Sequence, residues 1–225
     1  KEIIVKAFFI DCDGTLCDTL SIWRHLAEDD LRARGISPRA DLNAAIASYN
    51  LHQAAAYIKE SYALACGTED LLTAWEARLE DFYRYEAPAK AGAGAFLKGA
   101  RALGIACYCV SLTPEGLIRP LLRRVGLMDD LDAVFSGHEL DLGKDSPALY
   151  TYAASQVGLR PADGVVIEDS HFALQAAAAA GFHCWAFLDD FHGSDHNQSL
   201  AGDADAVLQS WQEGLDRLAC LNEDR

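Results

Sequence analysis

The stretch Ile4-Val5-Lys6-Ala7-Phe8-Phe9-Ile10-Asp11-Cys12-Asp13-Gly14-Thr15 decides the fold class. Residues 4–10 form a mostly apolar run, which is typical of a buried strand in a parallel sheet. Asp11 and Asp13 follow directly, and residues two apart in an extended chain point to the same side. Gly14 permits a tight turn after them. The stretch therefore predicts two carboxylates at the carboxyl end of a strand, the edge where open α/β sheets bind ligands.

The rest of the chain alternates between strand and helix patterns. Short apolar runs predict four further strands, at residues 105–110, 133–135, 165–167 and 184–187. Thr113-Pro114 and Ser146-Pro147 predict helix starts, each with a capping hydroxyl before a proline at the first helical position. A glycine followed by an apolar residue predicts helix ends at Gly35, Gly104, Gly126, Gly158 and Gly181. This alternation predicts a doubly wound α/β fold with a mainly parallel sheet.

One long segment does not alternate. Residues 18 to 85 carry helical patterns without a convincing strand, and breaks near residues 35–38 and 66–68 fit three or four helices. The chain rejoins the alternating pattern near Ala87-Pro88-Ala89. We therefore expect an α/β core domain of residues 1–17 and 88–225, with an all-helical domain of residues 18–87 inserted into it.

A second acid pair, Glu168-Asp169, follows the apolar run 165–167 and precedes a helix that Ser170 is placed to cap. Alone, this pair fits helix capping and complementation of the helix dipole. If its strand lies beside the first strand, however, Asp11, Asp13 and Asp169 converge. Hard oxygen ligands with room for water are typical of a magnesium site.

Two further strand-to-helix junctions carry groups that could hold an anion. Ser111 ends the 105–110 run, and its hydroxyl together with backbone N–H groups such as that of Leu112 could hold a phosphate at a helix start. Lys144 stands just ahead of the helix that Ser146-Pro147 predicts. A single lysine of this kind is usually an ordinary surface residue. Lys144 becomes a candidate site residue because the acid pairs are predicted at the same edge of the sheet.

Composition excludes several classes of partner. The 34 Asp and Glu against 19 Lys and Arg give a net charge of −15, which disfavours nucleic acid and anionic membrane surfaces. No apolar run approaches the roughly 20 residues of a membrane span.

The seven cysteines contain no CxxC pair and no secretion signal precedes them, so we expect reduced thiols and a cytoplasmic protein. A monomer or small homo-oligomer is expected.

These motifs together resemble the haloacid dehalogenase (HAD) superfamily, closest to its small phosphatases and β-phosphoglucomutase-like proteins with a helical cap. The family's first motif, DxDGT, matches Asp11 to Thr15, and its second and third motifs match Ser111 and Lys144. Its fourth motif matches Glu168-Asp169-Ser170. The usual Lys-Pro-x-Pro is Lys144-Asp145-Ser146-Pro147 here. The resemblance implies a Rossmann-like core with a helical cap over residues 18–87.

The resemblance also implies a mechanism. Asp11 would attack phosphorus and form an aspartyl-phosphate, and Asp13 would protonate the leaving oxygen and then activate water. The cofactor would be Mg²⁺, held by Asp11, Asp169 and the backbone carbonyl of Asp13, with Glu168 supporting the site. Lys144, Ser111 and the backbone at Leu112 would hold the phosphoryl group of a small phosphorylated metabolite.

The residues also bear on three alternatives to a phosphatase. Asp13 disfavours C–halogen cleavage, since the resembling dehalogenases lack that acid. A phosphomutase remains an alternative, although it needs a cationic cap and residues 19–87 hold seven Lys or Arg against eleven Asp or Glu. A non-catalytic binding protein on the same fold is the third possibility, and the complete motif set argues against it.

Some residues outside the motifs are weaker candidates. Asn50 and His52 stand where relatives often place a substrate-facing cap loop, but surface residues at a helix junction fit them better. His192, Asp195 and His196 cluster after the fifth predicted strand. No known metal-ligand spacing matches them, so a solvated polar loop is the expectation.

Overall fold

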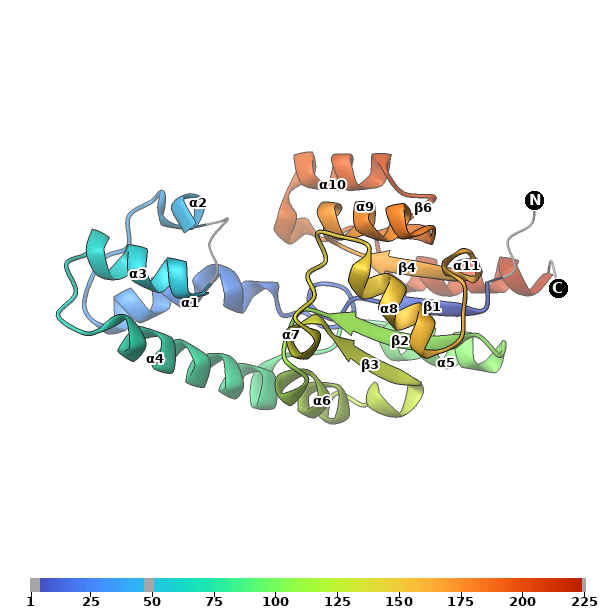
Figure 1. Cartoon of the computed structure of the whole chain (residues 1–225), viewed down its shortest axis with the longest axis horizontal. Helices are drawn as coiled ribbons and strands as arrows, with labels where there is room; N and C mark the ends of the chain where they lie inside the picture. The colour runs from blue at the N-terminus through green and yellow to red at the C-terminus, as the bar shows by residue number, and fades with distance from the viewer. Residues whose placement is uncertain (1–4, 47–50, 224–225) are drawn as a thin grey trace. The chain divides into compact units, whose positions relative to one another are not determined.

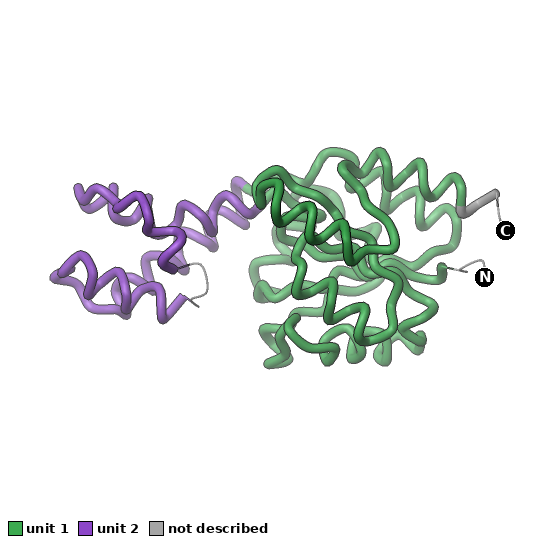
Figure 2. Tube along the Cα trace, turned by 90° about the horizontal axis from the view of Figure 1, so that it is seen from above, with its two compact units in different colours: residues 1–18, 87–225 green, residues 19–86 purple. Residues whose placement is uncertain are grey.

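The computed structural model describes residues 5–46 and 51–223 (Figure 1). The chain forms two compact units, one of residues 1–18 and 87–225 and the other of residues 19–86 (Figure 2). The first is called the core unit below and the second the helical unit. No helix among the described residues is long and apolar enough to cross a membrane.

A six-stranded parallel sheet forms the centre of the core unit, in the order β3-β2-β1-β4-β5-β6. The strand that carries the first acid motif lies in the middle, between β2 and β4, so the two acid pairs share one edge of the sheet. The strands are β1 (Ala7–Ile10), β2 (Ala106–Ser111), β3 (Ala133–Ser136), β4 (Gly164–Glu168), β5 (His183–Phe187) and β6 (Ala206–Leu208).

Helices cover both faces of this sheet, as the continuous apolar strands require. On one face Phe8 of β1 packs against Phe96 with ring centroids 5.1 Å apart, and Phe96 packs against Trp211 at 4.6 Å. On the other face Phe9 packs against Phe182 at 5.1 Å. The core-unit helices are α5 (Ala93–Ala102), α6 (Glu115–Arg124), α7 (Gly137–Leu140), α8 (Ala148–Gln156), α9 (His171–Ala180), α10 (Ser194–Gly202) and α11 (Trp211–Glu223).

The helical unit has its own apolar core. Its helices are α1 (Leu20–Ala33), α2 (Leu42–Ile46), α3 (Leu51–Ser61) and α4 (Thr68–Asp81), followed by a π-helical segment, η1 (Phe82–Glu86). Leu26 of α1, Ile58 of α3 and Trp75 of α4 are buried. Full burial of such side chains contributes about 1.5–3 kcal/mol each.

The chain leaves and re-enters the core unit at neighbouring points. The Asp18 N–H donates to the Pro88 carbonyl at 2.9 Å, and the Lys90 N–H donates to the Leu16 carbonyl at 2.9 Å. The loop after β1 is therefore tied to the returning chain by backbone hydrogen bonds.

The predicted α/β class and the parallel sheet are confirmed, and several details are corrected. The first strand begins at Ala7, and the three-residue β6 was missed. The helices after Thr113-Pro114 and Ser146-Pro147 begin one residue later than predicted, with Pro114 and Pro147 at their N-caps and no side-chain cap. Ser170 does occupy the N-cap of α9, but its hydroxyl makes no capping hydrogen bond.

Candidate active site

The loop after β1 presents its two aspartates differently. The Asp11 N–H donates to the Ile167 carbonyl at 3.0 Å, which extends the β1–β4 pairing to the first acid. Gly14 has a φ of +91°, a left-handed conformation that favours glycine, and its N–H donates to the Cys17 carbonyl at 2.8 Å. The tight turn leaves Asp11 buried and Asp13 half-buried.

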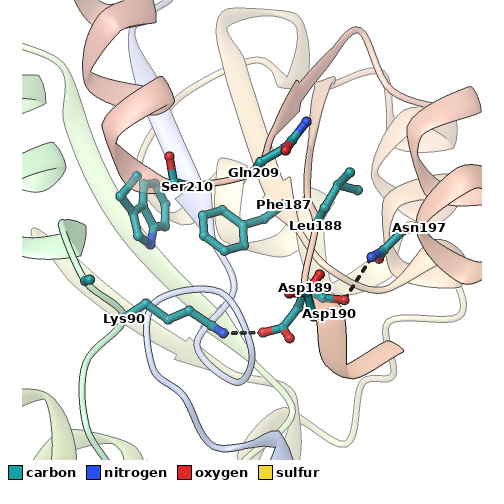
Figure 3. Close-up of a pocket in the computed structure, with 10 residues that line it drawn as sticks. Lys90, Phe187, Leu188, Asp189, Asp190, Asn197, Gln209 and Ser210 are labelled. Carbon is teal, nitrogen blue, oxygen red and sulfur yellow. Dashed lines mark hydrogen bonds and ion pairs between the residues drawn. The ribbon is translucent and has the colours of Figure 1, made fainter. Parts of the chain in front are cut away.

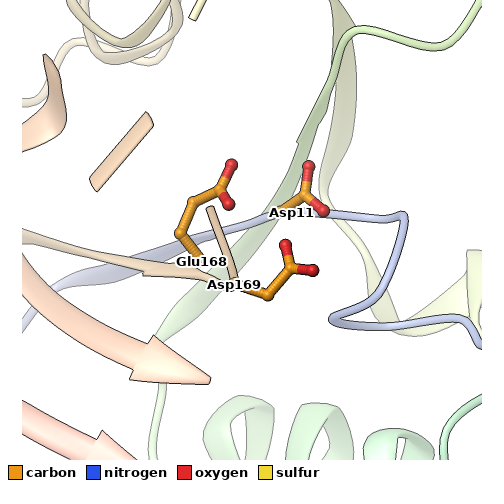
Figure 4. A group of neighbouring side chains, drawn as sticks. All are labelled: Asp11, Glu168 and Asp169. Atoms are coloured by element: carbon orange, nitrogen blue, oxygen red, sulfur yellow. The ribbon is translucent and has the colours of Figure 1, made fainter. Parts of the chain in front are cut away.

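Three buried carboxyl groups gather where β1 and β4 end (Figure 4). Asp11, Glu168 and Asp169 each offer one oxygen, and these oxygens lie within 4.8 Å of one another. The carboxylate of Asp13 does not belong to this group, so its backbone carbonyl remains the atom expected near a cation. The convergence of Asp11 with Asp169 follows from the adjacency of β1 and β4.

Lys144 lies between the acids and is only 4% exposed. Its ammonium forms ion pairs with Asp11 Oδ1 and, at 2.6 Å, with Glu168 Oε1. Glu168 Oε1 also accepts a 3.2 Å hydrogen bond from the Tyr150 hydroxyl, and Glu168 Oε2 accepts one of 2.9 Å from the Ser170 N–H. Glu168 therefore uses both oxygens to hold the lysine and the start of α9.

The carboxyl groups of this cluster outnumber its cationic groups. Three carboxylates and one ammonium leave a formal excess of two negative charges when all are ionised. Burial, together with the neighbouring acids, raises the pKa of Asp11 and of Asp169 well above the usual range. For Lys144, burial lowers the pKa, but Asp11 and Glu168 outweigh it and hold the pKa above its usual value.

A divalent cation fits this donor set. Hard carboxylate oxygens are the ligands that Mg²⁺ prefers, and a charge of +2 would balance the excess. Asp11 and Asp169 are the residues best placed to hold it, since Glu168 has both oxygens engaged by Lys144, Tyr150 and Ser170, whereas Asp11 pairs with Lys144 through Oδ1.

Asp13 is held by two hydroxyl groups at the end of β2. Asp13 Oδ2 accepts hydrogen bonds from Ser111 Oγ at 3.1 Å and from Thr113 Oγ1 at 2.8 Å. The Thr113 N–H in turn donates to Ser111 Oγ at 3.0 Å. Thr113 was predicted to cap a helix, and instead it orients the second aspartate of the motif. Leu112 between them is 43% exposed.

The loop after β5 corrects another expectation. His192 and His196 were expected in a solvated loop, but both contact Asp169. His192 Nε2 lies 2.8 Å from Asp169 Oδ2, and His196 Nε2 lies 2.8 Å from the Asp169 backbone oxygen. Asp195 is exposed as expected.

The two cap-loop candidates, Asn50 and His52, have different outcomes. Asn50 lies outside the described residues. His52 is largely exposed, and its Nε2 lies 3.9 Å from Glu69 Oε1, which fits a surface position in the helical unit.

The sequence analysis missed Tyr150 and gave three other residues of the site a different role. Thr113 was assigned to helix capping, although it stands two residues after Ser111 on the same rim. His192 and His196 were noted as a cluster but assigned to solvent, and Tyr150 carried no signal, because these contacts depend on how α8, η4 and α10 pack.

A separate cavity of about 430 Å³ opens at the carboxyl ends of β5 and β6 (Figure 3). The motif acids and Lys144 are not among its lining residues. Its walls combine the Lys90–Asp189 ion pair with the rings of Phe187 and Trp211. Trp211 also donates from Nε1 to the Thr15 carbonyl at 2.9 Å, so one wall supports the motif loop.

The haloacid dehalogenase-like hydrolase family matches residues 5–181, and the chain belongs to that family. A phosphoglycolate phosphatase of Nitrosospira multiformis is 30% identical over 217 residues, covering 93% of each protein. A HAD family hydrolase of Deinococcus radiodurans R1, whose crystal structure holds phosphate and sodium, is 27% identical with a TM-score of 0.76 and 98% coverage of each chain.

A putative β-phosphoglucomutase of Thermotoga maritima has the same fold. Its TM-score is 0.82 at 20% identity, with coverage of 96% of this chain and 99% of that one. The predicted HAD superfamily, the predicted fold and the prediction of an enzyme are therefore confirmed.

Proposed function

We propose that this chain is a Mg²⁺-dependent phosphohydrolase that acts on a small phosphorylated metabolite through an aspartyl-phosphate. One observation carries the proposal: a buried carboxylate cluster, two charges short of neutrality, adjoins a second aspartate held by two hydroxyls. The similarity to a phosphoglycolate phosphatase and to a hydrolase with bound phosphate and sodium supports it.

In the first step a carboxylate oxygen of Asp11 attacks phosphorus, and the bond from phosphorus to the ester oxygen breaks. Asp13 gives its proton to the departing oxygen, so the alcohol leaves neutral. In the second step Asp13 takes a proton from water, and the resulting hydroxide displaces Asp11 from phosphorus. Inorganic phosphate leaves and both aspartates return to their starting states.

The other residues support these steps. Lys144, held between Asp11 and Glu168, keeps the nucleophile in place and offers its ammonium to the phosphoryl oxygens. Ser111 and Thr113 fix Asp13 for proton transfer. The backbone N–H of Leu112 is assigned here to donate to a phosphoryl oxygen. Asp11 and Asp169, with the Asp13 carbonyl, would hold Mg²⁺, which would neutralise negative charge on the phosphoryl group.

The helical unit serves as the cap in this proposal. A cap that closes over an active site excludes water and selects the substrate. We assign this role to residues 18–87, one residue wider at each end than the compact unit. The partner is a small phosphorylated molecule rather than nucleic acid or membrane, and the protein acts as a monomer or small homo-oligomer. The seven free cysteines support a cytoplasmic location.

A phosphomutase of the β-phosphoglucomutase type is the second candidate, but the helical unit offers it little. A mutase must grip a second phosphate, which calls for cations not already neutralised. Five of the seven cap cations pair with acids of the same unit, namely Arg32, Arg34, Arg39, Arg78 and Arg84.

The test is a panel of phosphorylated metabolites, including 2-phosphoglycolate and hexose phosphates, assayed with Mg²⁺ and with a chelator. We expect phosphate release that requires Mg²⁺ and is lost in Asp11→Asn. Conversion of a hexose 1-phosphate into its 6-phosphate without phosphate release would favour the mutase. Activity unchanged in Asp11→Asn would exclude the covalent mechanism.

A further inference from the structure

The segment after β5 brings two histidines to the same aspartate. His192 ends the short helical turn η4 (Asp190–His192), and His196 lies in the first turn of α10. Their rings stack with centroids 4.2 Å apart and an interplanar angle of 21°. One reaches the Asp169 carboxylate and the other its backbone oxygen, both at 2.8 Å. We call this pair the histidine clamp.

The chemistry of the partners fixes the role of each ring. A carbonyl oxygen only accepts hydrogen bonds, so Nε2 of His196 carries the hydrogen. In His192 the corresponding tautomer, with hydrogen on Nε2, donates to Asp169 Oδ2 when that carboxylate is ionised, as it is when it holds a cation. Such charge-assisted bonds are stronger than neutral ones, and this one is shielded, because the Asp169 side chain is only 5% exposed.

The turn that carries the clamp is itself anchored. Asp189 Oδ1 accepts from the Phe191 N–H at 2.7 Å, and the Asp189 backbone oxygen accepts from the Asn197 amide at 2.9 Å. Figure 3 shows Lys90 and Asn197 both reaching Asp189. The chain around His192 is thus fixed to the core unit independently of Asp169.

A separate contact secures the far end of α10. Asp203, which follows α10, accepts from Gln175 at 2.9 Å and pairs with His171 at 2.8 Å, and both partners lie on α9. This contact docks the helix without touching Asp169, so it provides a matched control.

We infer that His192 and His196 are positioning residues that orient Asp169 as a cation ligand, an inference that rests on the proposed function. Oδ2 of Asp169 is occupied by His192 at 2.8 Å, and Oδ1, which accepts a longer hydrogen bond of 3.5 Å from the Thr15 hydroxyl, is the oxygen offered to a cation. Groups that hydrogen-bond a ligating side chain fix its direction, and their loss typically weakens metal binding 10- to 100-fold. The clamp therefore contributes to metal affinity through its contacts with Asp169.

The test compares two amides that differ by one methylene. In His192→Gln the side-chain nitrogen reaches about as far as Nε2 of histidine, whereas in His192→Asn it falls short. Mg²⁺ affinity is measured by isothermal titration calorimetry on the full chain without substrate, and melting in EDTA shows that each variant folds. The pair His196→Gln and His196→Asn provides a second series, and Asp203→Ala is the control.

We expect His192→Asn to weaken Mg²⁺ binding about 10- to 100-fold. His192→Gln should recover most of that loss, and Asp203→Ala should stay within about twofold of the wild type. Equal losses in the Asn and Gln variants, or a loss in Asp203→Ala as large as in His192→Asn, would contradict the proposal. Either result would mean that the histidines only dock α10 and do not orient Asp169. Unchanged affinity in His192→Asn would overturn the clamp alone, while a wild type that binds no Mg²⁺ would overturn the proposed function as well.

Discussion

Replacing Lys144 with methionine should destabilise the metal-free protein strongly. Methionine keeps most of the apolar stem but removes the ammonium that pairs with Asp11 and Glu168, whose side chains are 8% and 1% exposed. Removing one partner of a buried ion pair costs about 3–5 kcal/mol, because the remaining charge is left buried without compensation. For a unit of this size that loss lowers Tm by about 6–20 °C, at about 2–4 °C per kcal/mol.

The pH at which this contribution acts follows from the direction of the shift. The pKa of Lys144 is raised in the folded protein by Asp11 and Glu168, which outweigh burial. A raised lysine pKa stabilises the fold fully below the unfolded value and is lost only as the pH rises through the folded value. The effect of Lys144→Met should therefore be undiminished at neutral pH.

The assay is thermal unfolding followed by circular dichroism in EDTA and again with Mg²⁺. Lys98→Met, on the exposed face of α5, is the matched control and should change stability by no more than about 0.5 kcal/mol. Adding Glu168→Gln to Lys144→Met should recover part of the loss, since it removes one uncompensated charge. Mg²⁺ should raise the Tm of Lys144→Met more than that of the wild type. If Lys144→Met melts in EDTA like the Lys98→Met control, the buried charge cluster is described wrongly.

Three further predictions concern proton transfer, metal and thiols. Thr113→Val removes one of two hydroxyl donors to Asp13 and should lower kcat about 10-fold with little change in KM, whereas an unchanged kcat would argue against this role. Chelation should reduce phosphate-ester binding steeply by calorimetry, and affinity that survives EDTA would contradict the charge balance proposed for the site. Burial raises the pKa of Cys107 and of Cys184 to about 12, so at pH 8 only about one thiol in ten thousand is ionised. Mass spectrometry after iodoacetamide should find exposed Cys220 alkylated and these two unmodified, and rapid labelling of either would contradict their burial.

The sequence predicted most of the sheet because its strands are continuous apolar runs that end in polar groups. Asp11, Lys144 and Asp169 were found because each follows a strand or precedes a helix at the same edge, and the adjacency of β1 and β4 brings them together. The strand β6 was missed because three residues are too few to show a pattern.

The residues missed at the site depend on tertiary packing. His192 lies 23 positions after Asp169, and nothing in the spacing shows that η4 and α10 turn back towards the end of β4. Thr113 was assigned to helix capping because a hydroxyl before proline is a common helix start. In the fold the Thr113 hydroxyl donates to Asp13 Oδ2 instead. A hydrogen bond to a carboxylate is stronger than the neutral hydrogen bond that capping a backbone N–H would provide.

The most direct test of the proposed mechanism is to find where the phosphoryl group resides during turnover. The enzyme is mixed with its best substrate and Mg²⁺, quenched in acid, reduced with borohydride and mapped by peptide mass spectrometry. Reduction converts an acyl phosphate on aspartate into homoserine, so the account predicts homoserine at position 11, absent from Asp11→Asn and from a chelated sample. Modification at another residue, or full turnover by Asp11→Asn, would contradict it.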